Sequence, residues 1–179
     1  GRDKIARFVQ HRMLNMLITL KLFSAIMFGM NFAQKMIFWL LRVSLGWLFF
    51  YAGITKVLKP EWSAAEYIAG AKVFVEFFNF LASPEILPIV NLLNKWGLTL
   101  LGVSLMLGVL VRFSSFFGAV LMVLYYLAAL DFPHPNPHAY LVDEHIIYAL
   151  VLLFFMLTNA GKIGGIDRWW GKPPEIIEE

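Results

Sequence analysis

The side chains that could take part in chemistry gather where long apolar segments end. The polar residues at the predicted outer ends of these segments carry imidazole, phenol, carboxylate, hydroxyl and ammonium groups. They are Tyr51, Thr55, Lys56, Thr99, Tyr125, Tyr126, Asp131, Asp143, Glu144, His145 and Tyr148. A quinone head group needs hydrogen-bond donors for its carbonyls and protons for its reduction, and a His or Tyr backed by a carboxylate supplies both. These residues therefore make a candidate quinone site. The simpler alternative for each of them is an interfacial belt of aromatic residues with carboxylates that end helices in water.

A metal or haem site is a second use for the histidines. It would combine His134, His138 and His145 with Asp131 or Asp143, but no recognised ligand spacing is present. His134 and His138 alternate with three prolines, which prevent a regular helix. We therefore expect a rigid, solvent-facing turn there, and neither metal nor haem.

The elements that must position these residues are membrane-spanning helices. Hydrophobic residues make up 60% of the 179-residue chain, and charged residues make up 15%, against about 25% in soluble domains. Continuous apolar runs long enough to cross a bilayer select helices, because every backbone group must be satisfied within the segment. We predict an all-α fold, a bundle of four transmembrane helices with spans at residues 36–55, 96–111, 113–130 and 145–161. The residues between the first two spans form a helical outer loop that lies on the interface or caps the bundle.

Arg42 lies inside the first predicted span, at a depth where a guanidinium is costly unless it is paired. The candidate partners are Asp167 or the helix-end carbonyls near residues 161–165. We expect a structural role for Arg42 and Asp167, with a role in binding an anion or quinone as the alternative.

Lys and Arg are distributed unevenly between the two predicted sides of the membrane. One side receives Arg2, Lys4, Arg7, Arg12, Lys21, Lys35, Arg42, Arg112, Lys162, Arg168 and Lys172, while the other receives Lys56, Lys59, Lys72 and Lys95. By the positive-inside rule the richer side is cytoplasmic. We therefore predict a protein integral to the cytoplasmic (inner) membrane with both termini inside.

The N-terminal residues differ from the rest of the chain. Residues 3–20 place apolar side chains on one helical face and basic and polar ones on the other, which predicts an amphipathic helix on the membrane surface. The alternative makes residues 13–34 a fifth span, interrupted by Lys21. We divide the chain into a basic extension at 1–34, a four-helix domain at 35–170 and a tail at 171–179.

Composition also excludes several function classes. The chain has no cysteine, so it has no disulfide, thiolate catalysis or iron–sulfur ligation of its own. Its net charge of +3 comes from residues beside apolar segments rather than from a separate basic domain, so no nucleic-acid partner is expected. Any redox chemistry needs a borrowed cofactor or substrate.

Three motifs resemble the DoxX/DoxD family. Residues 42–56 (RVSLGWLFFYAGITK) resemble its opening helix, residues 102–112 (GVSLMLGVLVR) its second, and residues 143–150 with 160–167 its last. The resemblance covers residues 36–170 and is closest to the DoxD type, the membrane subunit of thiosulfate:quinone oxidoreductase. It implies a four-span bundle that works with other protein subunits and passes electrons to quinone.

If the chain is the membrane subunit of such an oxidoreductase complex, the candidate site residues take the following roles. His145, Lys56, Asp131 and Asp143 are candidates for catalysis. Lys56 attracts an anionic donor, and Asp131 or Asp143 handles protons. The candidate quinone-binding residues are Tyr51, Tyr148, His145 and Trp47. The alternative function is that of a non-catalytic accessory subunit in a larger respiratory or photosynthetic complex.

Overall fold

The computed structural model describes residues 30–169, and the regular elements of this part are all helices. The predicted amphipathic helix at 3–20, most of the alternative span at 13–34 and the predicted tail at 171–179 lie outside the described residues. The chain divides into two compact units after Ile37. In the first unit, Asn31 and Gln34 cap the start of helix α2 (Phe32–Val57) by exchanging two side-chain-to-backbone hydrogen bonds of 2.9 Å.

The second unit contains the other long helices. An α-helix, a π-helical segment and a further α-helix follow one another without a break as α5 (Leu87–Leu92), η1 (Leu93–Gly97) and α6 (Leu98–Leu107). They are followed by α7 (Val111–Ala129) and α8 (Glu144–Thr158). Within the described residues, three helical stretches are long and apolar enough to cross a membrane: Phe32–Val57, Leu87–Leu107 and Val111–Ala129. The all-helical membrane fold is thus confirmed. Because α8 has only 15 residues, the predicted count of four spans stays a prediction.

The second span begins earlier in the structure than the sequence predicted. The sequence places its start at residue 96, directly after the charged Lys95, but the helix already runs from Leu87. Lys95 is accommodated because its ammonium turns back and donates to the carbonyls of Lys59 and Pro60 at 3.4 and 3.3 Å. A long cationic side chain at a helix end can leave the apolar region in this way.

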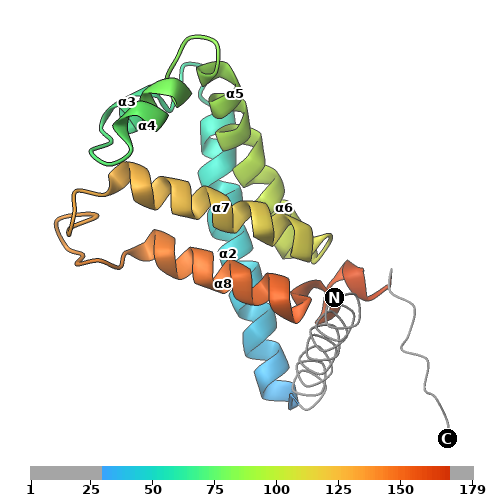
Figure 1. Ribbon diagram of the computed structural model, residues 1–179. Helices are drawn as coiled ribbons and strands as arrows, with labels where there is room; N and C mark the ends of the chain where they lie inside the picture. Colours follow the sequence, from blue (N-terminus) through green and yellow to red (C-terminus); the bar gives the residue numbers. More distant parts are fainter. Residues whose placement is uncertain (1–29, 170–179) are drawn as a thin grey trace, which may run out of the picture. The chain divides into compact units, whose positions relative to one another are not determined.

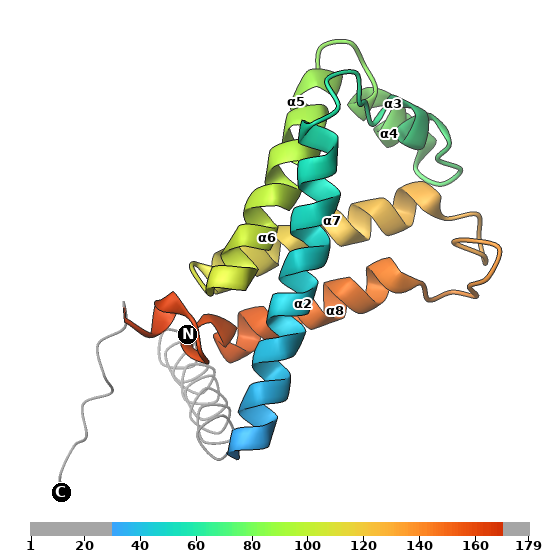
Figure 2. The ribbon, with the colours of Figure 1, turned by 180° about the vertical axis from the view of Figure 1, so that it is seen from behind.

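Residues 38–169 form two antiparallel helix pairs that cross obliquely, α2 with α6 and α7 with α8 (Figures 1 and 2). Glycines let α2 and α6 approach until their backbones touch. A Cβ atom at Gly53 would lie 2.3 Å from the backbone nitrogen of Thr99, and one at Gly102 would lie 2.3 Å from that of Phe50. This close approach explains the small residues that the sequence places in both helices.

The turn between α6 and α7 is short and tightly bonded. Gly108 and Leu110 both adopt left-handed backbone conformations, with φ of 69° and 51°. The hydroxyl of Ser104 lies 2.6 Å from that of Ser114 and donates to the carbonyl of Val109 at 2.5 Å. The turn thus brings α7 back across the end of α6.

The outer loop folds into two short helices, α3 (Ala65–Ala69) and α4 (Val75–Leu81). Ile68 and Phe78 are buried there against Ala128 at the end of α7, with Leu87 and Val90 of α5 packed beside them. The loop therefore packs over the start of α5 and the end of α7, in line with one of the two arrangements expected for it.

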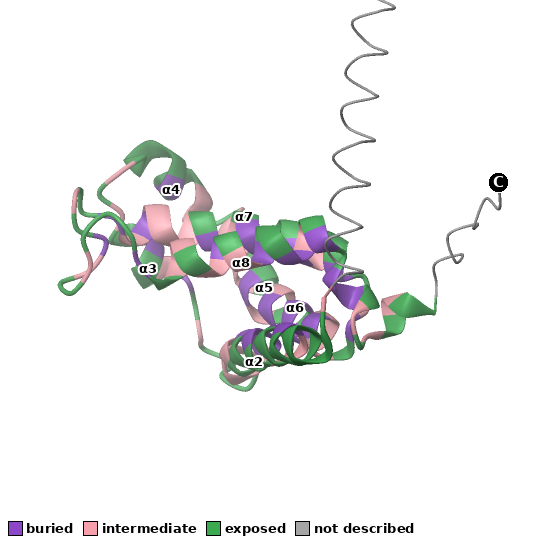
Figure 3. Cartoon of the chain, turned by 90° about the horizontal axis from the view of Figure 1, so that it is seen from below, coloured by how far each residue is buried: buried purple, intermediate pink, exposed green. Residues whose placement is uncertain are grey.

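Exposed residues run along the long helices (Figure 3), and many of them are large apolar residues. The exposed side chains include Trp47, Phe113, Phe116, Leu150 and Phe154. Each long helix has one packed face and one exposed apolar face, which lipid covers at low cost. The chain is therefore a membrane protein whose apolar helices contact lipid.

Candidate functional site

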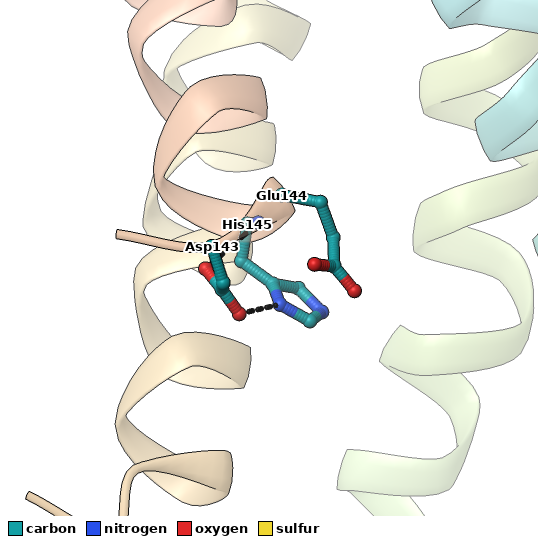
Figure 4. A group of neighbouring side chains, drawn as sticks. All are labelled: Asp143, Glu144 and His145. Carbon is teal, nitrogen blue, oxygen red and sulfur yellow. Dashed lines mark hydrogen bonds and ion pairs between the residues drawn. The ribbon is translucent and has the colours of Figure 1, made fainter. Parts of the chain in front are cut away.

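Asp143 and His145 form a hydrogen-bonded pair at the start of α8 (Figure 4). The Oδ1 of Asp143 accepts the backbone amides of His145 and Ile146, and its Oδ2 lies 2.7 Å from Nδ1 of His145. The Asp143 side chain is 1% exposed and that of His145 is 23% exposed. The buried carboxylate orients the ring and favours a proton on Nδ1, so Nε2 is the nitrogen that can meet a ligand.

A second group of polar side chains lies against His145. The Tyr125 ring centroid is 5.7 Å from that of His145, and the Tyr125 hydroxyl donates to Oδ1 of Asn94. Asn94 is buried in the π-helical segment, and its amide donates to the Val90 carbonyl at 2.9 Å. Tyr67 of α3 donates to the backbone carbonyl of Tyr125 at 2.9 Å. Together, Tyr67, Asn94, Tyr125, Asp143 and His145 form what we call the outer polar cluster.

Burial and nearby negative charge favour the neutral form of the Tyr67 phenol. Partial burial, with smaller contributions from the charges of Asp143 and Glu144, raises the pKa of Tyr67 to about 12. Tyr67 therefore remains a hydrogen-bond donor at any physiological pH.

The four candidate quinone-binding residues lie on different faces. The ring of Tyr148 packs edge-on against Phe49 of α2 at a centroid distance of 6.0 Å, on the same helix as His145. Trp47 and Tyr51 are 59% and 61% exposed, and at 100° per residue they lie on the side of α2 opposite Phe49. The structure thus brings Tyr148 and His145 to one side of α2 and leaves Trp47 and Tyr51 on the other.

The remaining candidate catalytic residues, Lys56 and Asp131, have other partners. The Lys56 ammonium donates to the Ala52 carbonyl at 3.0 Å and lies 5.4 Å from the centre of the Trp62 ring. Asp131 forms an exposed ion pair with Lys72 at 2.5 Å.

The three histidines considered for a metal site are placed in two environments. The ring of His134 packs against Tyr140, and the backbone amide of His138 donates to the Asn136 side chain, while His145 bonds to Asp143. Within residues 30–169, one group of potential ligands has atoms within 4.8 Å of one another, and it consists of Asp143, Glu144 and His145. It contains neither of the histidines of the proline-rich turn.

At the opposite ends of α7 and α8, Arg42 is completely buried. It donates three hydrogen bonds, from Nη1 to the carbonyls of Ala160 and Ile163 at 2.6 and 3.1 Å and from Nη2 to that of Gly164 at 3.1 Å. Of the two kinds of partner considered for Arg42, Asp167 or the helix-end carbonyls, the structure shows hydrogen bonds to the carbonyls. A cation at the C-terminal end of α8 also complements the helix dipole.

Asp167 supports the same region from the other side. Its carboxylate accepts the backbone amides of Leu110 and Val111 at 2.7 and 3.0 Å, at the start of α7. We call Arg42, Asp167 and the carbonyls of Ala160, Ile163 and Gly164 the inner polar knot. It connects α2, the start of α7 and the segment after α8.

Sequence reasoning missed the part played by Asn94 and Tyr67 in the outer polar cluster. Asn94 precedes Lys95 and was interpreted as part of a loop before the span. Its signal was available, since a buried amide inside an apolar helix needs a hydrogen-bond partner. The partner, Tyr125, follows 31 residues later in the chain.

The fold and the two polar groups define a helical membrane protein with ionisable residues at both ends of its spans. The model of the DoxX family matches residues 37–134, more than half of the chain. The chain belongs to the DoxX family. No curated protein and no solved structure matches it.

Proposed function

We propose that this protein is the membrane subunit of a quinone-linked oxidoreductase complex and that a quinone head group meets His145 and Tyr148 at the outer polar cluster. The observation that carries the proposal is the pair of Asp143 and His145, in which a buried carboxylate lies 2.7 Å from Nδ1. Within the described residues, Nε2 of His145 takes part in no hydrogen bond, so this nitrogen can bond to a ligand. A partly exposed imidazole held in this way donates or accepts a proton at one defined atom.

The surroundings of His145 fit an aromatic carbonyl ligand. Tyr148 follows His145 by three residues on α8, and its ring packs against Phe49 of α2. The ring of Tyr125, on α7, packs against the imidazole itself. Bound quinone would supply the redox chemistry as the electron acceptor. Once protonated, His145 would donate a hydrogen bond and then a proton from Nε2 to one carbonyl, leaving the neutral ring with its proton on Nδ1. Asp143 would stabilise the imidazolium until that proton is transferred.

The proposal also includes an electron donor and an orientation in the membrane. Electrons come from a donor oxidised on a partner subunit, thiosulfate being the donor in the DoxD type that the chain resembles. The distribution of Lys and Arg supports insertion in the cytoplasmic membrane with both termini inside. This orientation requires α8 to cross as a fourth span, with its 15 residues covering about 22 Å.

A second candidate function, an accessory subunit without chemistry, is favoured by a different observation. The hydroxyls of Tyr125 and Tyr67 are already bonded to Asn94 and to a backbone carbonyl. In an accessory subunit the outer polar cluster serves only to fix the helix ends.

Quinone reduction in native membranes or in the purified complex decides between the two functions. We expect His145→Gln and Asp143→Asn to lower turnover by about 10²-fold or more, as the loss of a general acid does. His134→Gln is the matched control, because this histidine lies in the proline-rich loop with its ring against Tyr140. Unchanged turnover in both cluster variants, with the protein still assembled, would leave the accessory function.

A further inference from the structure

A groove lies between the start of α7 and the end of α8, away from the outer polar cluster. It has a volume of about 490 Å³. Its apolar lining comes from both helices and includes Phe113, Phe116 and Met156, and its charged lining consists of Arg112, Lys162 and Asp167. The function proposed above makes no use of this groove.

The charges of the groove select an anion. Arg112 and Lys162 are exposed, and neither takes part in the ion pairs found within residues 30–169. The one carboxylate of the lining, Asp167, has its oxygens bonded to the amides of Leu110 and Val111. Arg112 and Lys162 are thus available to bind a ligand, whereas the Asp167 carboxylate is already hydrogen-bonded to the protein backbone.

The groove lies where a span reaches the polar interface, and this position favours an amphiphilic ligand. Arg112 stands in the first turn of α7, a helix apolar and long enough to span the bilayer, so its guanidinium lies where a span reaches the polar interface. Phe113 and Phe116 are 65% and 48% exposed just beyond it along the helix. A ligand with a phosphate on the cations and hydrocarbon on the phenylalanines satisfies both parts of the surface.

We propose that this groove binds one anionic phospholipid, with its phosphate between Arg112 and Lys162 and an acyl chain along Phe113, Phe116 and Met156. The complementary charge identifies the ligand as anionic, and the apolar floor distinguishes a lipid from free phosphate. The site is independent of the quinone proposal, because it uses no residue of the outer polar cluster.

The test measures binding of phosphatidylglycerol and phosphatidylcholine to the full-length, delipidated protein in detergent by native mass spectrometry. We expect one tightly held phosphatidylglycerol and clearly weaker binding of phosphatidylcholine. Arg112→Gln with Lys162→Gln should weaken phosphatidylglycerol binding about tenfold or more, since each basic side chain near an anionic lipid contributes about fivefold. Lys59→Gln with Arg168→Gln removes the same charge from exposed positions outside the lining and should leave binding unchanged.

A second variant tests the apolar part of the site. Met156→Trp keeps the charge and fills the floor, so it should also weaken binding of phosphatidylglycerol. Equal affinity for the two lipids, or equal losses in the groove and control variants, would overturn the proposal. Displacement of the lipid by inorganic phosphate alone would overturn it as well, because the acyl chain would then contribute nothing.

The chain's own acidic residues are a competing occupant. Glu175, Glu178 and Glu179 follow the described residues. Lipid binding that appears only after all three are replaced by Gln would assign the groove to this segment and overturn the lipid proposal.

Discussion

At the scale of single residues, Arg42 is the side chain whose loss should cost most. It is completely buried and satisfies three carbonyl groups. Arg42→Met leaves those carbonyls without donors, and we expect a loss of about 3–5 kcal/mol in the free energy of unfolding. Thermal or denaturant unfolding in detergent measures this loss.

Lys59→Met is the matched control for Arg42→Met, because Lys59 is an exposed cation. It should change stability by less than about 0.5 kcal/mol. Equal effects of the two substitutions would contradict a structural role for the inner polar knot.

The raised pKa of Tyr67 predicts how the free energy of unfolding changes at alkaline pH. Its pKa is raised from 10.0 to about 12 in the folded protein, chiefly by burial. Because the folded state disfavours the phenolate, the contribution of Tyr67 is complete below pH 10 and is lost as the pH rises from 10 to about 12. Unfolding curves across this range should show a smaller alkaline loss for Tyr67→Phe than for the unaltered protein, and identical losses would refute the assignment.

At the scale of elements, the contact between α2 and α6 depends on Gly102. A Cβ atom there would lie 2.3 Å from the backbone nitrogen of Phe50 and 2.6 Å from the carbonyl oxygen of Gly46. Gly102→Ala must push the two helices apart, and we expect a loss of about 1–3 kcal/mol in unfolding experiments.

The same helical stretch offers its own control in Gly97. A Cβ atom at that position would meet no atom within 4 Å. Gly97→Ala should therefore be neutral or stabilise the helix by up to about 1 kcal/mol. A loss at Gly97 as large as that at Gly102 would mean that the contact between the helices is not the cause.

The sequence predicted the elements better than their contacts. The length of the apolar segments identifies the long helices. The cost of burying a charge was enough to predict that the Arg42 guanidinium has polar partners near residues 161–167. The sequence did not reveal Asn94 as the partner of Tyr125, because that contact depends on how η1 and α7 face each other. Nor did it separate Trp47 and Tyr51 from Tyr148, because depth along a helix says nothing about its face.

At the scale of the whole molecule, the absence of cysteine makes the topology directly measurable. Single cysteines at Ala139, in the loop before α8, and at Arg168, after it, report the two ends of that helix. If α8 crosses the membrane, a membrane-impermeant maleimide should label Ala139→Cys in intact cells and Arg168→Cys only after permeabilisation. Labelling of both from the same side would show that α8 does not cross.

The inner polar knot also has a consequence for biogenesis. Arg42 and its acceptor Ala160 are separated by 118 positions in the chain. During synthesis from the N-terminus, the guanidinium is made long before the carbonyls that neutralise its burial cost. Correct assembly therefore depends on carbonyls made at least 118 positions after Arg42. Nascent chains that stop before Ala160 should be recognised by membrane proteases and degraded faster than chains that include residues 160–164.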